Sequence, residues 1–230
     1  TGFKRDRANF ETLGYQMMTQ PGAPSSSENR YATGLNLGTG VELGGTARID
    51  TQGSLNATGN ALDMAIEGAG FFQVLLPGGR TGYTRAGNFT MSADGTIVTP
   101  DGKPLQPNIQ VPEGATGVSV GADGTVSATV PGQAEATELG RIEIARFVNP
   151  SGLQAIGDNM LVETAASGAP QVGAAGEEGR GILRSGMLEG SNVNVVEELV
   201  DMIETQRAYE VNSKMISATD EMMKNASQTL

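Results

Sequence analysis

The residue types that most often carry catalysis are scarce in this sequence of 230 residues. It contains no Cys and no His, which excludes thiolate chemistry, Ser-His-Asp triads and nearly all zinc sites. Carboxylates, Ser, Tyr, Lys and Arg remain, so a pair of acids for glycoside hydrolysis stays open. Glycosidase sites usually also present aromatic platforms, whereas this chain has no Trp and only 4% aromatic residues. The composition therefore favours a non-enzymatic protein, and no cofactor or metal is expected.

Two copies of an Ala-Asp-Gly-Thr tetrapeptide, at 93–96 and 122–125, are the next candidates for chemistry. Calcium binding is an alternative for these acids, but the ligand spacing of an EF-hand loop is absent. In the second copy, a three-residue loop places apolar side chains opposite one another, and a two-residue loop does not. We therefore predict a type I turn with Gly124 left-handed in a G1 bulge. The expected pairs are Val120 with Val126, Val118 with Ala128 and, in the first copy, Met91 with Ile97.

Two glycine-rich stretches, 34–40 and 68–72, invite comparison with nucleotide-binding loops. The first lacks the Lys and the helix that follow a P-loop, and the second lacks the rest of a dinucleotide fingerprint. We interpret both as sites of close backbone packing. The net charge of −11 makes nucleic-acid binding improbable, because nothing would neutralise the phosphates. We therefore expect neither a nucleic acid nor a small-molecule substrate as a partner.

Residues 33–190 have the pattern of a β-rich domain, with dense glycine, short apolar runs and frequent turn dipeptides. Residues 63–76 indicate two strands joined by a glycine-rich bend. Phe72, Val74 and Leu76 should face one side of the sheet and Gln73 the other. Residues 141–144 alternate charged and apolar side chains, which predicts a half-buried strand.

Residues 1–32 form a separate N-terminal segment in this interpretation. Phe3, Phe10, Leu13 and Met17 recur at roughly helical spacing, which is compatible with a short helix or with an extended arm. Residues 21–30 form a Pro- and Ser-rich stretch, which taken alone is typical of a disordered linker.

Residues 191–230 contain no Pro and no Gly and predict one long amphipathic helix. Asn194, followed three residues later by Glu197, resembles a capping box. A helix of about 33 residues would be roughly 50 Å long, more than its own domain can cover. Its apolar stripe should therefore contact another helix, and the stripe shifts register near Gln206. The predicted contact residues are Val196, Leu199, Val200, Ile203, Ala208, Val211, Met215, Ala218 and Met222.

Three segments resemble the bacterial flagellar rod and hook proteins. They are Thr1-Gly-Phe-Lys-Arg5 at the start, the central DMAIEGAGFFQV from Asp63 with YTRAGNF from Tyr83, and SNVNVVEELVDMI from Ser191 with QRAYEVNSK from Gln206. They span most of the chain in the family's order. The 206–214 stretch and the 20–25 segment are most similar to the distal rod members, with the proximal rod paralogues as the alternative.

The resemblance implies a structural subunit that assembles with copies of itself into a helical tube in the periplasm-spanning basal-body rod. The implied partners are proximal rod proteins, the hook protein, the surrounding rings and the flagellar type III export apparatus. Family members carry a helix ahead of the Thr-Gly-Phe-Lys-Arg motif, so the terminal-helix domain is expected to lack that partner here. Residues 20–30 are expected to restrict sliding between subunits, so a rod without them should bend more in electron micrographs, and unchanged straightness would refute this.

Two alternatives come from other classes of protein. One is an acid-pair module that cleaves peptidoglycan, which would need a pocketed pair of carboxylates. The other is a secreted β-rich binding module, which has no use for the C-terminal helix. Deletion of residues 191–230 separates the second alternative from the rod interpretation.

Overall fold

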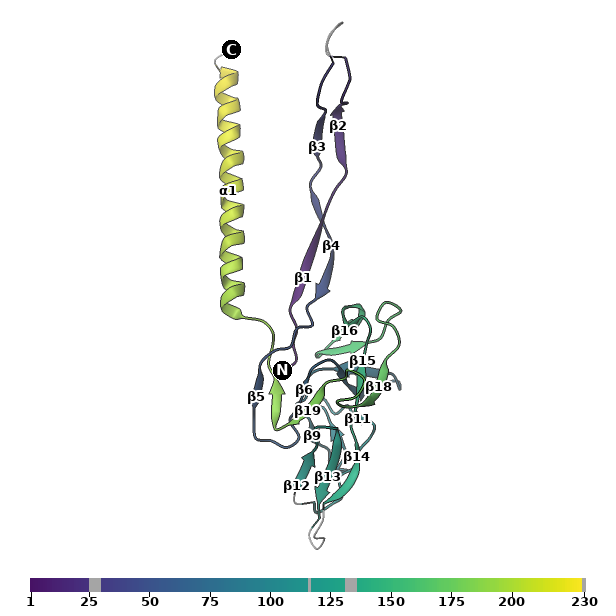
Figure 1. Cartoon of the computed structure of the whole chain (residues 1–230). Coiled ribbons are helices and arrows are strands. Elements are labelled where there is room, and N and C mark those ends of the chain that lie inside the picture. Colours follow the sequence, from purple (N-terminus) through teal and green to yellow (C-terminus); the bar gives the residue numbers. More distant parts are fainter. Residues whose placement is uncertain (25–29, 116, 131–135, 229–230) are drawn as a thin grey trace.

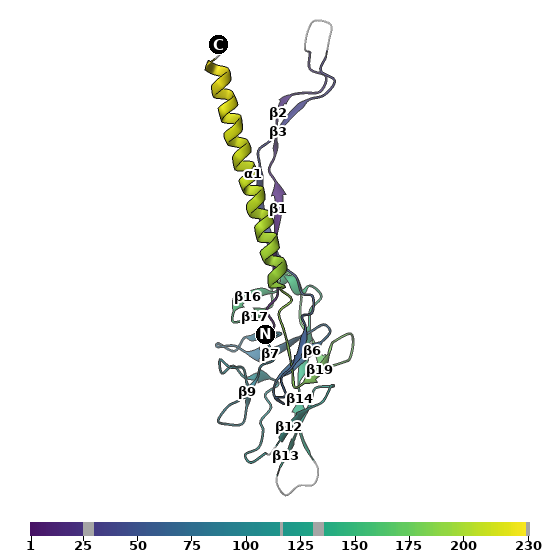
Figure 2. The ribbon, with the colours of Figure 1, turned by 90° about the vertical axis from the view of Figure 1, so that its left-hand side faces the viewer.

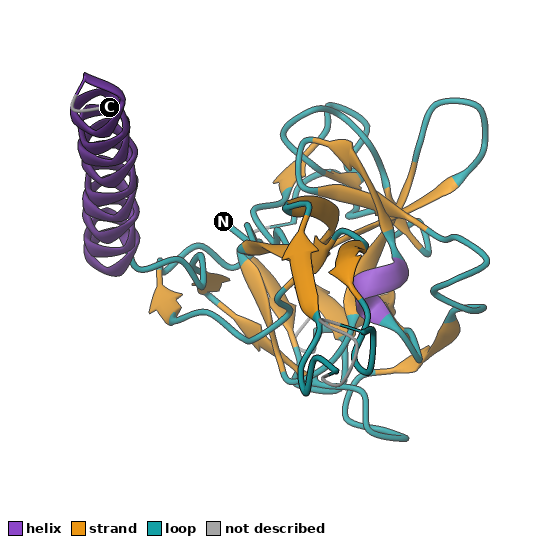
Figure 3. Cartoon of the chain, turned by 90° about the horizontal axis from the view of Figure 1, so that it is seen from above, coloured by secondary structure: helices purple, strands orange, loops and turns teal. Residues whose placement is uncertain are grey.

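A β-rich domain, a long arm and a single long helix make up the chain in the computed structural model (Figure 1). The structure describes residues 1–24, 30–115, 117–130 and 136–228. The arm and the helix leave the same end of the β-domain and extend in a similar direction (Figure 2). Seen from above, the helix stands clear of the strands (Figure 3). The expected class, mainly β with a long C-terminal helix, is confirmed.

The largest sheet of the β-domain has seven strands among the described residues, all in antiparallel pairs. Its order is β16 (Gln154–Gly157), β17 (Met160–Val162), β8 (Thr81–Thr84), β7 (Phe71–Leu75), β15 (Glu143–Arg146) and β18 (Gln171–Ala174), with β11 (Leu105–Gln106) also on β7. Smaller sheets surround it. They pair β5 (Leu55–Ala57) with β20 (Met187–Glu189), β6 (Met64–Glu67) with β19 (Ile182–Ser185), β9 (Thr90–Met91) with β10 (Ile97–Val98), and β13 (Thr125–Thr129) with β12 (Gly117–Val120) and β14 (Thr137–Arg141). A short 3-10 helix spans Pro150–Gly152.

Strand β7 lies in the middle of this sheet and contributes to two apolar clusters. Phe72 and Val74 are fully buried in the larger cluster, and Phe71 belongs to the second. Successive side chains of a strand point to opposite faces, so the two clusters lie on opposite sides of β7. Leu76 is buried as well, and Gln73 is only 8% exposed because the second face is also covered.

The predicted hairpin registers are confirmed. Val120 pairs with Val126, and Val118 pairs with Ala128. Gly124 has φ +92°, so it is left-handed as the G1 bulge requires. The first copy also has the predicted register, with Met91 opposite Ile97. The alternation predicted for 141–144 is confirmed, since Ile142 and Ile144 are buried, Arg141 is exposed and Glu143 is half-buried. The single strand predicted there is wrong, because β14 ends at Arg141 and β15 begins at Glu143.

Gly124 is a turn position where an added side chain should be costly. A Cβ there would lie 2.4 Å from the carbonyl oxygen of Ile142, whereas Gly102, with φ +81°, has open space around its Cβ position. Gly102→Ala should lower the free energy of unfolding by about 1–2 kcal/mol, the cost of a left-handed backbone conformation for a residue with a side chain. Gly124→Ala should lower the free energy of unfolding further, because its Cβ also displaces backbone. Denaturant titration of both variants measures the difference, and equal losses would contradict the close approach.

The arm is a long antiparallel ribbon, so the extended alternative for residues 1–20 is the correct one. Strand β1 (Asp6–Thr12) pairs with β4 (Val41–Arg48), and β2 (Tyr15–Thr19) pairs with β3 (Leu35–Gly38). The arm therefore includes residues up to Arg48, beyond the expected boundary after residue 32, and we propose a domain boundary near residue 50. Part of the Pro- and Ser-rich stretch, residues 25–29, lies outside the described residues.

The C-terminal helix, α1 (Val195–Gln228), has 34 residues, in agreement with the predicted length. It begins where expected, because the side chain of Asn194 accepts a hydrogen bond from the backbone N–H of Val196 at 3.1 Å. Glu197 and Glu198 lie in the first turn, where negative charge is favourable for the helix dipole. Over its described residues α1 lacks the length of apolar sequence that a membrane span requires.

Candidate assembly surface

Helix α1 buries almost none of its apolar side chains against its own chain. All nine predicted contact residues lie on α1, and all are exposed. The least exposed of the large ones, Val200 and Ile203, are each 49% exposed, and Met222 reaches 69%. Along 195–226 only Glu198 is half-buried. The expectation that this helix is too long for its own domain agrees with this exposure.

A second apolar column on α1 escaped the sequence analysis. It consists of five exposed side chains that recur every seven residues, namely Val195, Met202, Tyr209, Ile216 and Met223. Three of them directly follow members of the predicted stripe, and consecutive helical residues are about 100° apart around the axis. The signal in the sequence is the recurrence of these apolar residues every seven positions. It overlaps with the 3-4 spacing of the predicted stripe. Helix α1 therefore presents apolar side chains in two directions.

The arm adds a further exposed apolar surface. Its large side chains are open to solvent although they lie on paired strands. Phe10 and Met17 were recognised from their spacing in the sequence, whereas the other exposed side chains of the arm carry no such local signal. The exposed set is Phe10, Tyr15, Met17, Met18, Leu35, Leu37, Val41 and Leu43. Exposure of so many apolar groups on neighbouring projections is typical of a protein-interaction surface.

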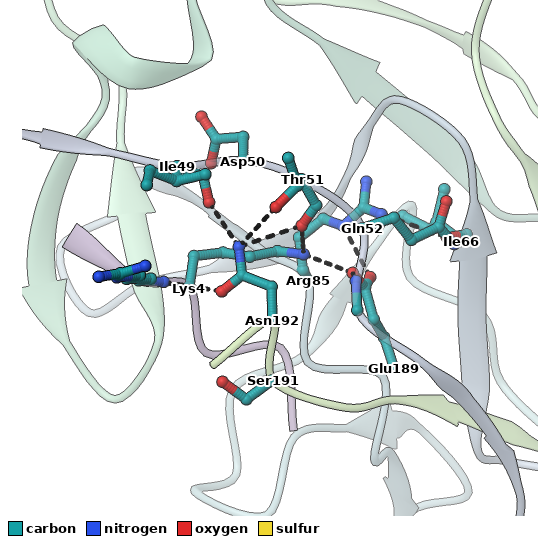
Figure 4. Close-up of polar contacts among 12 residues, drawn as sticks. Lys4, Ile49, Asp50, Thr51, Gln52, Ile66, Arg85, Glu189, Ser191 and Asn192 are labelled. Carbon is teal, nitrogen blue, oxygen red and sulfur yellow. Dashed lines mark hydrogen bonds and ion pairs between the residues drawn. The ribbon is translucent and has the colours of Figure 1, made fainter. Parts of the chain in front are cut away.

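A buried group of charges lies where α1 and the arm leave the β-domain (Figure 4). The carboxylate of Glu189, 1% exposed, forms ion pairs with Lys4 and with Arg85, whose Nε lies 2.9 Å from Glu189 Oε2. The backbone N–H of Gly53 also donates to Glu189 Oε1 at 3.0 Å. Arg85 donates further hydrogen bonds to the carbonyl oxygens of Ile66, Gly68 and Gly70. We call Lys4, Arg85 and Glu189 the buried charge cluster.

Asn192 lies beside this cluster, in the link between β20 and α1 (Figure 4). Its Nδ2 donates to the carbonyl oxygens of Ile49 at 2.8 Å and Thr51 at 3.3 Å, and its Oδ1 accepts from the backbone N–H of Arg5 at 2.8 Å. The side chain of Arg5 in turn pairs with Glu198 of α1 at 2.7 Å. One side chain thus connects both ends of the arm to the start of the helix.

The carboxyl group of Glu189 has its pKa held below the ordinary value. Burial by itself would raise this pKa, but the charge of Arg85 and the hydrogen bonds from Lys4 and Gly53 outweigh burial. A group whose folded pKa is depressed stabilises the protein above its unfolded pKa, and this contribution is lost as the pH falls through the folded pKa. The stabilisation by ionised Glu189 should therefore be complete above about pH 4.5, the ordinary value, and should decline progressively below it until the pH has passed the lower folded pKa.

Acid titration of the Glu189→Gln variant tests this dependence. The difference in free energy of unfolding between the unsubstituted chain and Glu189→Gln should be largest at neutral pH and should shrink as the pH falls below about 4.5. Other carboxylates titrate in both proteins, so their effects largely cancel. Denaturant titrations at each pH measure the difference. A difference that stays constant across the range would show that the charge of Glu189 does not stabilise the fold.

Within the described residues no group of three or more Asp, Glu, His or Cys side chains could hold a metal ion. A hollow of about 350 Å³ beside β7 and β11 is lined by Gln73, Leu105 and Gln106, with Glu143 as its acid. The Asp123 carboxylate of the second Asp-Gly turn accepts from the hydroxyl of Thr125 at 2.7 Å, which is the turn role that was predicted for it.

Comparisons with known proteins identify the family. Residues 65–128 match a model described as the flagellar hook protein FlgE/F/G D1 domain, and residues 184–229 match the flagellar basal body rod FlgEFG protein C-terminal model. The flagellar basal-body rod protein FlgG of Buchnera aphidicola is 48% identical over 99% of this chain and 87% of its own length. FlgG of Caulobacter vibrioides is 46% identical over the same shares, and FlgG of Bacillus subtilis is 38% identical over 96% and 85%. FlgF of C. vibrioides is 38% identical over 81% of the chain and 72% of its own length. The chain therefore belongs to the flagellar basal-body rod proteins, and within them to the FlgG group.

Proposed function

We propose that this chain assembles with copies of itself through α1 and the arm, as a structural subunit of the flagellar distal rod. Its place in the basal-body rod follows from the family, whose members are structural proteins. The finer proposal is that the subunits form a helical tube that transmits torque from the motor to the hook. The observation that carries it is the exposure of the large apolar side chains on α1, which ranges from 49% to 77%.

The physical argument starts from the solvation of α1. Soluble monomers rarely expose contiguous apolar patches of more than a few hundred Å². Helix α1 exposes apolar columns in two directions along roughly 50 Å, and the arm beside it exposes more. A single partner helix covers one seam, so two directions require contacts with more than one neighbour. Repeated contacts between unlike surfaces of identical subunits build open helical assemblies.

The proposed partners at the ends and around the tube follow from its position in the basal body. Rod and hook components assemble there with members of this family. We propose proximal rod proteins at one end, the hook protein at the other, basal-body rings around the shaft, and export through the flagellar type III apparatus. A proximal position in the rod is the second candidate. It is supported only by the similarity to FlgF, which covers less of the chain than the similarity to FlgG.

Deletion of the codons for residues 191–230 from the chromosomal gene tests the role of α1. Because the β-domain has its own apolar clusters, the shortened chain should still fold but should not enter rods. Electron microscopy of purified basal bodies and swimming assays measure the outcome. Complete basal bodies and normal swimming with the shortened chain would refute assembly through α1, and would favour a β-domain that acts alone.

A further inference from the structure

We propose that the buried charge cluster, together with Asn192, is a positioning joint that fixes the directions of α1 and the arm relative to the β-domain. The inference rests on the proposed function, because it concerns how one subunit presents its two assembly surfaces. The residues of the joint need not contact a neighbouring subunit. They would act by orienting α1 and the arm, which make the contacts.

Three chain segments meet in this joint. The first precedes β1, the second follows β4, and the third connects β20 to α1. Backbone hydrogen bonds connect them, from Gly2 N–H to Glu189 O at 3.0 Å, from Ile49 N–H to Arg5 O at 2.8 Å, and from Gly190 N–H to Ser54 O at 2.7 Å. The root of the arm and the root of the helix are therefore one connected structure rather than two independent linkers.

The buried charge cluster connects this structure to the body of the β-domain. Glu189 Oε1 accepts from Lys4 and Gly53, whereas Oε2 accepts from Arg85. Arg85 is 9% exposed and is itself held by three backbone carbonyl groups next to β6 and β7. Each of the three connected segments thus reaches the β-domain through one carboxylate.

The presence of charged groups rather than apolar ones at this position indicates that the joint sets the orientation of α1 and the arm. Burying charges costs free energy, and well-packed apolar side chains often stabilise a fold as well or better. Apolar packing is non-directional, whereas a carboxylate with both oxygens occupied restrains the angles of all its donors. A joint that must resist twisting gains from the second property.

Outside the buried cluster, further contacts restrain the two projections. Arg5 pairs with Glu198 at 2.7 Å and Asp201 at 3.4 Å on the first turns of α1. On the arm side, Arg48 at the end of β4 donates to the carbonyl oxygen of Pro150 at 3.0 Å. Asn192 bonds to Arg5 itself and to Ile49, the residue that follows Arg48. The helix and the arm are thereby restrained at their bases, although most of their described residues are exposed.

Glycine allows the segments to approach this closely. A Cβ at Gly53 would lie 2.2 Å from the carbonyl oxygen of Gly190, a separation that backbone atoms cannot accept. Gly53 is also the residue whose N–H donates to Glu189. Gly53→Ala should therefore disturb the joint from a position outside the charges, and it serves as an independent variant.

Distance measurements between spin labels test the joint. The sequence has no Cys, so pairs of cysteines can be introduced as Asp94→Cys with Asp220→Cys, and as Asp94→Cys with Glu42→Cys. All three positions are exposed, on the β-domain, α1 and the arm respectively. In the otherwise unsubstituted chain, both pairs should give narrow distance distributions by pulsed electron paramagnetic resonance. Glu189→Gln and Gly53→Ala should each broaden both distributions and populate distances absent from the parent.

Two controls separate positioning from general loss of stability. Glu67→Gln removes an exposed ion pair with Arg184, and Val126→Ala opens a cavity in the apolar core away from the joint. Val126→Ala should lower the melting temperature yet leave both distributions narrow, as should Glu67→Gln. Distributions that stay narrow in Glu189→Gln, or that broaden equally in Val126→Ala, would overturn the proposal. Should Glu189→Gln fail to fold, Asn192→Ala takes its place with the same expected broadening.

Two different experiments test the joint and the assembly proposal separately. Narrow distributions in the joint variants would remove the joint but leave assembly through α1 intact. Conversely, rods that form normally with a charge in the apolar stripe of α1 would refute assembly, whatever the distances within one subunit.

Discussion

Glu189→Gln is expected to lower the free energy of unfolding at neutral pH by about 3–5 kcal/mol, the usual cost of removing one partner from a buried ion pair. The substitution keeps the shape of the side chain but leaves Lys4 and Arg85, 7% and 9% exposed, without a buried counter-charge. It also places an amide NH₂ group where a carboxylate oxygen accepted hydrogen bonds. Urea titration followed by circular dichroism measures the loss.

Glu67→Gln is the matched control for this result. It makes the same change of functional group and breaks a Glu–Arg pair of similar length, 2.7 Å, whose two side chains are 45% and 49% exposed. Exposed pairs contribute about 0–1 kcal/mol, so its effect should be small. Equal losses for the two variants would mean that burial of Glu189 has no special consequence, and the account of the joint's energetics would be wrong.

Met215→Glu is expected to abolish rod assembly while leaving the stability of the free subunit nearly unchanged. Met215 is 64% exposed in the single chain, so the substitution should change the free energy of unfolding by no more than about 0.5 kcal/mol. In the assembled rod the same position would be covered by a neighbour, where an unpaired carboxylate costs several kcal/mol. Because every 1.4 kcal/mol changes an association constant tenfold and each subunit carries the change, assembly should fail.

Ser217→Glu provides the comparison on the same helix. It adds the same single charge two residues away, at an exposed position roughly opposite the apolar columns. Swimming assays and electron microscopy of basal bodies should show loss of rods with Met215→Glu and retention with Ser217→Glu. If both variants assemble, or if both fail, the apolar stripe does not determine the contact.

Local signals explain what could be predicted of the fold. The Asp-Gly turns were predicted correctly because Gly124 and the alternation around it lie within ten residues of one another. Helix α1 was predicted because its cap at Asn194 and its apolar spacing are likewise local. The arm was not predicted as a hairpin, since Asp6 pairs with Arg48 and the sequence holds no sign of that distant pairing.

The buried charge cluster was invisible to the sequence analysis for the same reason. Lys4 and Glu189 are 185 positions apart, and Arg85 and Glu189 are 104 apart. Charged residues in an acidic chain are normally solvated, so no pattern distinguishes these three from the others. Lys4 lies in the Thr-Gly-Phe-Lys-Arg segment that carried the family resemblance, but the resemblance did not indicate its partner. Only the fold brings these groups together.

Thiol protection at position 215 tests the central claim, assembly through α1, most directly. A Met215→Cys variant supplies a single thiol, since the sequence has no Cys of its own. A maleimide reagent should label this thiol rapidly in the free subunit, where Met215 is exposed, and slowly in rods isolated from cells. A Ser217→Cys variant, labelled in parallel, measures how fast a thiol on the polar face of α1 reacts. Equally rapid labelling of position 215 in free subunits and in rods would contradict the claim.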